Sequence, residues 1–315
     1  MRLSSRNANP PRVQTRGHKS PLENPRFPTG GFVKIRAYAK INLFLDVLAK
    51  RSDGYHDIFS VMQSVSLHDE LVISKTARGV HLKCSDLTLP TDGRNLVVKA
   101  ADALVRECDI REGIDIVLTK RIPAGAGLAG GSSNCAAALA GINELFNLQI
   151  PHERLLKIAK TLGADVPFCL VGGTATVEGI GEKITPTEPH PPCYIVIAIP
   201  EIHVSTPETF ARLNAKNFNN AQAREKFLDA CDKKIVSQIA KSLYNVFTPI
   251  TATHFPEISD LILRFQSLGA EGAEMSGTGS AVFAYFADET SAKAAVRSIN
   301  CRAFLCSPIQ RKDSP

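Results

Sequence analysis

The stretch Ile122-Pro-Ala-Gly-Ala-Gly-Leu-Ala-Gly-Gly-Ser-Ser133 decides the fold, since it places four glycines within seven positions ahead of two hydroxyl residues. Glycine lets the backbone bend freely and approach a ligand closely. The free N–H groups at a helix start favour an anion. Alternation of Ile114, Ile116 and Leu118 predicts a strand before this loop, and the alanine-rich segment after it predicts a helix over about 132–146. A strand, a glycine loop and a helix start together indicate a phosphate-binding site.

The surroundings of the loop exclude three common kinds of phosphate site. Gly125-x-Gly127-x-x-Gly130 matches the dinucleotide pattern, but Pro151 opens a second predicted helix where a dinucleotide-binding oxidoreductase would have its next strand. A Walker loop requires Lys after Gly130, and Gly131 stands there. We find no protein-kinase catalytic-loop or metal-binding motifs downstream.

The rest of the chain predicts an α+β fold in two halves. Before the loop we expect strands at 33–37, 41–48, 71–73 and 81–84, and a helix from a capping Asn95 to about Cys108. After it we expect a helix over 151–163, strands over 174–178, 194–199 and 281–286, several helices between 207 and 268, and a helix over 289–299. Four prolines within 186–192 mark the domain boundary. We therefore predict a basic tail over 1–31, an N-terminal domain over 32–187 and a C-terminal domain over 188–315.

Composition and charge argue against nucleic acid and membranes as partners. The chain has 315 residues, 44% of them hydrophobic, which is enough for a sizeable core. Residues 1–31 hold six Lys and Arg residues against Glu23 alone, so most of the net charge of +6 lies in a tail rather than on a folded face. No window approaches 18 uninterrupted apolar residues.

The tail and the cysteines favour a cytoplasmic protein. The tail is rich in Pro, Asn, Ser and Arg, and we expect it to be disordered because it offers little apolar surface to bury. An organellar transit peptide is the weaker interpretation, since an amphipathic pattern is missing. The eight cysteines form no CxxC pair and no zinc spacing, which favours reduced thiols in the core.

Four motifs in order carry a resemblance to a known family. The glycine loop resembles the central motif of the GHMP kinases, named for galactokinase, homoserine, mevalonate and phosphomevalonate kinases, with Ala129 where some members carry glycine. The other motifs are Ala39-Lys-Ile-Asn-Leu-Phe-Leu45 with Arg51-x-Asp53-Gly-Tyr-His56, Leu162-Gly-Ala-Asp-Val-Pro-Phe168, and Met275-Ser-Gly-Thr-Gly-Ser280. The resemblance covers roughly residues 33 to 310.

This resemblance implies a two-domain GHMP kinase fold with the active site in the cleft between the domains. ATP is the implied co-substrate, and Mg²⁺ is expected to bridge its phosphates, with Ser133 as a possible ligand and no acidic metal ligand evident. The implied nucleotide-binding residues are Asn95, Pro123, Ala124, Gly125, Ala126, Gly127, Leu128, Ala129, Gly130, Gly131, Ser132 and Ser133.

Asp165 and Lys40 are the implied catalytic residues. Taken alone, Asp165 is typical of a helix cap or turn, and Lys40 of a strand lysine that reaches water. The resemblance instead makes Asp165 the base for the acceptor hydroxyl and places Lys40 beside it, where an ammonium favours the charged carboxylate. Asn42 lies two residues after Lys40, on the same strand face, and is expected to contact the substrate.

The pairing of the motif at 39–45 with Asp53-Gly-Tyr-His56 and with the motif at 162–167 narrows the resemblance to one branch of the superfamily. That branch phosphorylates a cytidine-diphosphate-linked methylerythritol in the non-mevalonate route to isoprenoids. Tyr55, His56 and Phe210 are then expected around the cytosine, with Thr206 beside them. The alternatives are another GHMP kinase with a different acceptor, and a non-catalytic binding protein on the same fold, which should lack Lys40 or Asp165. We expect a monomer or a weak homodimer.

Overall fold

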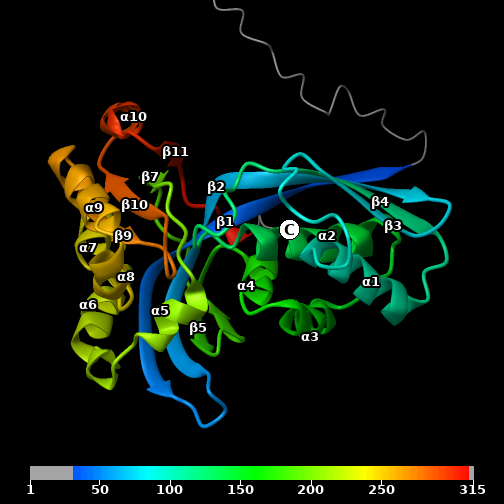
Figure 1. Ribbon diagram of the computed structural model, residues 1–315, viewed down its shortest axis with the longest axis horizontal. Coiled ribbons are helices and arrows are strands. Elements are labelled where there is room, and N and C mark those ends of the chain that lie inside the picture. Colours follow the sequence, from blue (N-terminus) through cyan, green and yellow to red (C-terminus); the bar gives the residue numbers. More distant parts are fainter. Residues whose placement is uncertain (1–30, 312–315) are drawn as a thin grey trace, which may run out of the picture.

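Two β-sheets, each with helices packed against it, form the framework of the protein (Figure 1). The computed structural model describes residues 31–311. The predicted basic tail therefore lies outside the described residues, apart from Gly31. The mixed helix and sheet content confirms the predicted α+β class.

The first sheet is built on two long strands. Its strands are β1 (Phe32–Lys50), β2 (His56–Thr76), β3 (Val80–Cys84), β4 (Gly113–Thr119), β5 (Thr174–Gly179), β6 (Lys183–Pro186) and β8 (Tyr244–Asn245). They are ordered β3-β4-β2-β1-β8, with β5 and β6 beside β2. The two strands predicted at 33–37 and 41–48 are one strand, because bulges at Tyr38/Ala39 and Asn42/Phe44 bend β1 without ending it.

Four helices cover one face of this sheet (Figure 1). They are α1 (Leu96–Cys108), α2 (Gly130–Leu145), α3 (His152–Leu162) and α4 (Val166–Val171). Asn95 caps α1 as predicted, since its Oδ1 accepts a hydrogen bond from the Val97 N–H at 2.9 Å. Two helices in succession after the glycine loop confirm that the chain does not continue as a dinucleotide-binding unit.

The predicted start of α2 was wrong by two residues. Ala129 adopts the left-handed conformation at φ 54° and is the N-cap, so the helix begins at Gly130. Ser132 and Ser133 therefore lie inside the first turn and do not cap the helix. Ten of the sixteen residues of α2 are buried, and its small side chains allow close packing on the sheet: a Cβ on Gly141 would come within 2.6 Å of the Ile73 side chain.

The second sheet is wholly antiparallel. Its strands, in the order β11-β7-β10-β9, are β11 (Arg302–Cys306), β7 (Tyr194–Ile199), β10 (Val282–Phe286) and β9 (Gly272–Met275). The helices of this half are α5 (Thr206–Ala211), the short 3₁₀ helix η1 (Ala215–Asn217), α6 (Ala221–Lys233), α7 (Val236–Lys241), α8 (Thr248–His254), α9 (Glu257–Ser267) and α10 (Glu289–Ser298). The predicted strands near 194–199 and 281–286 are confirmed.

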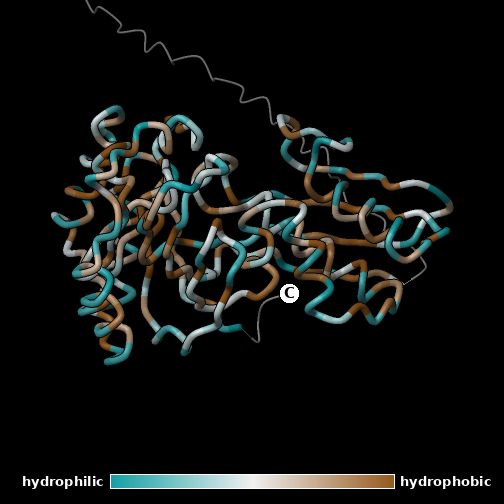
Figure 2. Tube along the Cα trace, turned by 90° about the horizontal axis from the view of Figure 1, so that it is seen from below, coloured by the Kyte–Doolittle hydropathy of each residue, from teal (hydrophilic) through white to brown (hydrophobic). Residues whose placement is uncertain are grey.

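The two halves pack against each other through a shared hydrophobic core. Ile41 from the first sheet packs in one cluster with Ile197 and Phe283 from the second. Strand β8 comes from the second half of the chain but pairs with β1 in the first sheet. Figure 2 shows hydrophobic residues concentrated inside both halves, with polar residues toward the surface. This shared core and the pairing of β8 with β1 join the two halves.

Within residues 31–311, no helix has the length and apolar character needed to cross a membrane. All eight cysteines are free thiols. Burial raises the pKa of Cys135, Cys193, Cys231 and Cys306 to about 12, so these thiols stay protonated near neutral pH.

Candidate active site

A cleft of about 630 Å³ opens between the glycine loop and the residues that lead into α5. This volume lies in the range of small-molecule sites. The predicted site residues that line it are Asn95, Pro123, Ala124, Gly125, Ala126, Gly127, Ala129, Gly130, Gly131, Ser132, Asp165 and Thr206. The structure therefore brings together residues from four of the segments that the sequence analysis selected.

Contacts with both halves hold the glycine loop in shape. The backbone N–H of Lys40 donates to the Leu128 carbonyl at 3.1 Å, and the Ser276 hydroxyl donates to the Gly127 carbonyl at 3.0 Å. Gly127 has φ +75°, and a Cβ there would overlap the Ser276 carbonyl oxygen and lie 3.0 Å from the Gly279 carbonyl oxygen. Only glycine fits this point, because the backbone conformation and the close approach both exclude a side chain.

Two loop residues point away from the cleft. Leu128 is buried. Ser133 is also buried, and its hydroxyl donates to the Tyr38 carbonyl at 2.6 Å. The Ser133 hydroxyl therefore closes a contact between α2 and β1, and magnesium coordination by Ser133 stays a prediction. Ser132 is the hydroxyl residue that lines the cleft.

Asn95 lines the cleft, but its amide is engaged within the protein. Its Oδ1 accepts from the Val97 N–H, and its Nδ2 donates to the Pro90 carbonyl at 2.7 Å. These bonds fix the start of α1 as one wall of the cleft. Contact between Asn95 and the adenine of ATP stays a prediction.

Lys40 and Asp165 meet at the edge of the cleft. The Lys40 Nζ lies 3.8 Å from Asp165 Oδ2 and donates to Asn42 Oδ1 at 2.7 Å. Asn42 Nδ2 in turn donates to the Ser60 hydroxyl at 2.9 Å, which donates to the Phe44 carbonyl at 2.7 Å. Lys40 and Asn42 are almost fully buried. This chain of hydrogen bonds aims the ammonium of Lys40 at the carboxylate.

Asp165 occupies the N-cap position of α4, as its sequence context predicted, but its side chain makes no capping hydrogen bond. Its carboxylate is one-third exposed, with 34% of the side-chain surface accessible. A carboxylate beside a buried ammonium, open to a phosphate-binding cleft, is suited to accept a proton from an acceptor hydroxyl.

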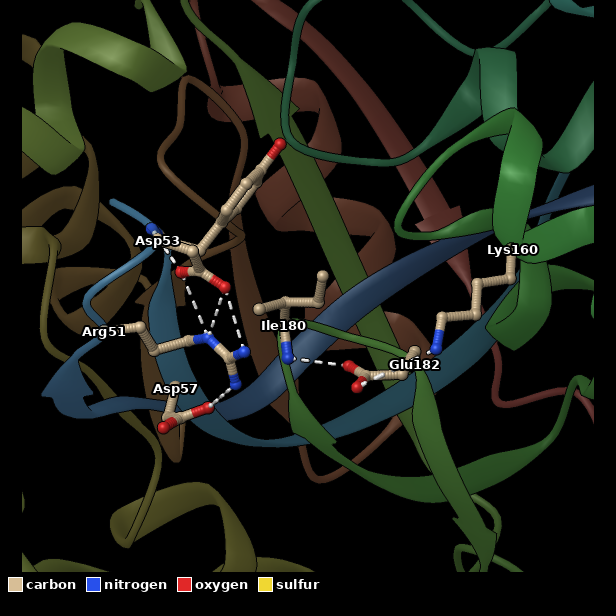
Figure 3. Close-up of polar contacts among 7 residues, drawn as sticks. Arg51, Asp53, Asp57, Lys160, Ile180 and Glu182 are labelled. Carbon is tan, nitrogen blue, oxygen red and sulfur yellow. Dashed lines mark hydrogen bonds and ion pairs between the residues drawn. The ribbon is translucent and has the colours of Figure 1, made fainter.

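The turn between β5 and β6 supports the segment that carries Asp165. Glu182 accepts from the Ile180 N–H at 2.7 Å and lies 4.0 Å from the Lys160 ammonium on α3 (Figure 3). A Cβ on Gly181 would lie 3.4 Å from the Ala164 carbonyl oxygen. The turn therefore packs directly behind the residue that precedes Asp165.

A second network shapes the turn that carries Tyr55 and His56. The Arg51 guanidinium donates to Asp53 through Nε and Nη2 and to Asp57 through Nη1 at 3.1 Å (Figure 3). Asp53 Oδ1 accepts from the Tyr55 N–H at 3.1 Å, and the Arg51 N–H donates to the Tyr55 carbonyl at 2.8 Å. These bonds fix the turn while the Tyr55 side chain stays 62% exposed and available to a ligand.

His56 belongs to an aromatic cluster with the predicted Phe210. The ring centroids of His56 and Phe210 lie 5.4 Å apart, and Phe218 lies edge-on to His56 at 6.0 Å. Burial, with a smaller contribution from the charge of Lys50, lowers the pKa of His56 below its ordinary value. The imidazole is therefore neutral near pH 7 and has one donor and one acceptor nitrogen, which suits the edge of a base.

Thr206 lines the same cleft as the glycine loop. Its hydroxyl lies 2.9 Å from the Thr278 hydroxyl, so it links the start of α5 to the glycine turn of the last motif. Its contact with the acceptor stays a prediction.

The structure adds three residues that the sequence analysis missed. Lys120 and His203 line the cleft, and the buried Asp69 pairs with Lys120 from below the loop. The basic pair Lys120-Arg121 just before the loop was an available signal for a phosphate site. Asp69 had no local signal, because its partners lie 51 to 65 residues away in the chain.

Glu274, which directly precedes the Met275–Ser280 motif, makes the stability of the fold sensitive to pH. Burial raises its pKa from 4.5 to about 7, although the Thr248 hydroxyl and the Met275 N–H donate to it. A raised pKa means that the folded state binds the proton more tightly than the unfolded state. This contribution to stability is full below about pH 4.5 and is lost as the pH rises through about 7.

The free energy of unfolding should therefore fall by about 1–3 kcal/mol more in the wild type than in Glu274→Gln between about pH 5 and pH 8. Urea unfolding at several pH values measures this difference. Glu289→Gln is the control, since Glu289 is exposed. Parallel pH profiles for the wild type and Glu274→Gln would contradict the assignment.

A glycine loop at a helix start, facing a carboxylate–ammonium pair across a cleft, defines a small-molecule kinase site. Residues 95–173 match the family described as GHMP kinases N terminal domain, and residues 227–304 match GHMP kinases C terminal. The predicted two-domain GHMP kinase fold, with its site in the cleft between the halves, is confirmed.

Relatives narrow the assignment further. A protein of Acetivibrio thermocellus named 4-diphosphocytidyl-2-C-methyl-D-erythritol kinase is 39% identical over 274 residues, which cover 87% of this chain and 97% of that protein. One of the same name from Caldicellulosiruptor bescii is 42% identical over 267 residues, covering 84% and 93%. The chain belongs to the 4-diphosphocytidyl-2-C-methyl-D-erythritol kinase family.

Solved structures agree with this assignment. A crystal structure of 4-(cytidine 5'-diphospho)-2C-methyl-D-erythritol kinase is similar at a TM-score of 0.78 and 32% identity, covering 88% of this chain and 99% of that one. Homoserine kinase from Cytophaga hutchinsonii has a TM-score of 0.69 at 21% identity, covering 91% and 98%, and shows the shared fold alone.

Proposed function

We propose that the protein transfers the γ-phosphoryl group of ATP to the 2-hydroxyl of 4-diphosphocytidyl-2-C-methyl-D-erythritol. The observation that carries this proposal is the Lys40–Asp165 pair at the edge of the cleft that the glycine loop lines. The hydroxyl oxygen bonds to the γ-phosphorus, the bond from that phosphorus to ADP breaks, and the hydroxyl proton passes to Asp165. Lys40 stabilises the negative charge that develops on the attacking oxygen.

The glycine loop is suited to the triphosphate. Free backbone N–H groups at the start of α2 and the positive end of its dipole favour the phosphate charge. Lys120 adds a cation to the same wall. In-line transfer then requires the acceptor hydroxyl between this wall and Asp165, where the cleft is open.

Magnesium fits this site as a companion of the nucleotide. Mg²⁺ is commonly held by one or two carboxylates together with substrate phosphates. Among the described residues that line the cleft, Asp165 is the one acidic side chain, and no group of three His, Cys, Asp or Glu side chains within residues 31–311 could hold a metal ion. The phosphates would therefore supply most ligands, and Ser132 is the hydroxyl placed to assist. When bound, the ion neutralises charge on the phosphates.

The aromatic residues Tyr55, His56 and Phe210 are suited to a cytosine. Tyr55 offers an exposed ring, and His56 and Phe210 offer a partly buried wall with a neutral imidazole. Stacking and hydrogen bonding to one base explain why the turn of Arg51 to His56 is held so firmly, because a preordered pocket loses less entropy when it binds.

Trimming the aromatic pocket should weaken the acceptor and spare ATP. Stacking contributes roughly 1–3 kcal/mol per base, so Tyr55→Ala should raise the acceptor KM about 5- to 150-fold. His56→Ala should act similarly, since it leaves polar edges of the base unpaired. Steady-state kinetics with both substrates varied measure the effect. The KM for ATP should stay within about twofold of the wild-type value, well below the tenfold change that 1.4 kcal/mol represents.

Tyr194→Ala is the matched control, because Tyr194 is a partly exposed tyrosine on β7 of the second sheet. An acceptor without the cytidine part, such as methylerythritol phosphate, should be a poor substrate. Equal use of that acceptor, or an unchanged acceptor KM in both pocket variants, would favour another GHMP kinase activity.

One chain supplies every residue named in this site, so a monomer should be active. We place the reaction in the cytoplasm, where ATP is available and where eight free thiols are stable.

A further inference from the structure

The two ends of the glycine loop converge on one buried carboxylate. Asp69 lies on β2 and has no exposed surface. Its Oδ1 accepts from the backbone N–H groups of Arg121 at 2.5 Å and Ile122 at 2.8 Å. Its Oδ2 accepts from Asn134 Nδ2 at 2.8 Å and pairs with the Lys120 ammonium.

The positions of these partners explain what the carboxylate does. Arg121 and Ile122 immediately precede the loop, and Asn134 follows it in the first turns of α2. Every loop residue that lines the cleft lies between these two attachment points. One side chain from a different strand therefore sets the distance between the two ends of the loop.

The packing around Asp69 leaves little freedom. A Cβ on Gly130 would lie 2.9 Å from the Ile122 side chain and 3.2 Å from the Lys120 ammonium, so the helix start rests directly on the chain that enters the loop. Asn134 Oδ1 accepts from Lys120 Nζ at 3.1 Å and closes the network. Four donors meet two carboxylate oxygens, which is the full number that a carboxylate accepts well.

Lys120 compensates the negative charge of Asp69 on the side of the cleft. An unpaired carboxylate beneath an anion site would repel the phosphates. Lys120 lies between Asp69 and the cleft, since it pairs with the carboxylate and also lines the cleft. Asp69 itself does not line the cleft, so it acts on a ligand through the loop that it holds and through the ammonium that it pairs with.

We propose that Asp69 is a positioning residue for the nucleotide: it holds both ends of the glycine loop so that the backbone N–H groups face the triphosphate before ATP arrives. This inference rests on the proposed function, in which the loop binds ATP. A loop that is already ordered pays less conformational entropy on binding, and its dipoles need no reorganisation.

Asp69→Asn is the direct test, because it keeps the shape and removes one acceptor oxygen. Whichever way the new amide turns, two of the four donors lose their acceptor. The dissociation constant for a fluorescent N-methylanthraniloyl ATP, titrated without acceptor, should rise about 10- to 100-fold, the range expected for lost hydrogen bonds to a charged group. The KM for ATP should rise in parallel, and the acceptor KM should stay within about twofold.

Glu70→Gln is the matched control. Glu70 is the next residue on β2 and pairs with Lys34 at the surface, away from the loop. Its loss should leave both the ATP dissociation constant and the acceptor KM unchanged.

Exchanging the two partners should rescue the defect. In Asp69→Asn combined with Asn134→Asp, the amide oxygen at position 69 accepts from the two backbone N–H groups and its nitrogen donates to the new carboxylate. That carboxylate also accepts from Lys120. The nucleotide dissociation constant of the double variant should return to within about threefold of the wild type, which a loss of stability unrelated to the loop would not produce.

The outcomes separate this inference from the function on which it rests. A wild type that binds no ATP overturns the proposed function itself. A wild type that binds ATP, with Asp69→Asn binding equally well or with both KM values raised alike, overturns the positioning role alone.

If Asp69→Asn does not fold, Asn134→Ala provides the test, since it removes the bonds of Asn134 to Asp69 and to Lys120 but leaves Asp69 paired with Lys120 and with the two backbone N–H groups. The nucleotide dissociation constant should then rise about 3- to 10-fold, and an unchanged value overturns the proposal.

Discussion

Asp165→Asn is expected to lower kcat about 10²- to 10⁴-fold, the usual range for one acid–base group. The amide keeps the size and shape of the carboxylate but cannot take the proton of the acceptor hydroxyl. Because Asp165 stands at the edge of the cleft and makes no capping hydrogen bond with α4, folding and nucleotide binding should be retained. Single-turnover kinetics, with ATP affinity measured by titration, separate the two effects.

Asp109→Asn is the control for this experiment. Its side chain is 88% exposed, and its left-handed backbone at φ 50° is one that asparagine tolerates as well as aspartate. The control should retain full activity. Near-normal turnover in Asp165→Asn would remove Asp165 as the base and leave the Lys40–Asp165 pair with a structural role only.

Gly127→Ala is expected to have the second largest effect, and Gly125→Ala is its matched partner. Both glycines have positive φ, +70° at Gly125 and +75° at Gly127, so alanine should cost roughly 1–2 kcal/mol of backbone strain at either position. The difference lies in the surroundings. A Cβ at Gly125 would meet His203 at 3.8 Å, an ordinary contact, whereas a Cβ at Gly127 would overlap the Ser276 carbonyl.

Alanine at position 127 must therefore push the glycine loop away from the turn of the last motif. We expect kcat/KM for ATP to fall about 100-fold in Gly127→Ala, the size of effect that a displacement near 1 Å produces. Gly125→Ala should lose at most about tenfold, in line with its backbone strain. Equal losses in the two variants would show that strain within the loop, and not its contact with the second half, controls activity.

Much of the fold could be predicted because it depends on chemistry within a few residues. Asn95 caps α1, Pro151 precedes α3, and the alternation or apolar runs of β5 and β7 correspond to the observed strands. Each of these features depends on residues that are neighbours in the chain, so it can be identified without knowing the tertiary structure.

Other elements had no such local signal. The strands β8, β9 and β11 are two to five residues long and form because a neighbouring strand is there to pair with. Strand β1 continues through three register shifts only because β2 pairs with it along almost its whole length. The start of α2 depends on Ala129 adopting a left-handed conformation, which alanine does not favour by itself.

The sequence by itself determined the phosphate loop and the kinase family, because motifs of a few residues identify both. The family resemblance then predicted that Lys40 lies beside Asp165. Only the tertiary structure decided that Ser133 faces Tyr38, that Asp69 ties both ends of the loop, and that Gly127 rests on Ser276. The Asp69–Ile122 contact spans 53 residues and the Gly127–Ser276 contact spans 149. Contacts over such distances form only when the sheets and helices pack, because burial then brings distant polar groups together and requires each to find a partner.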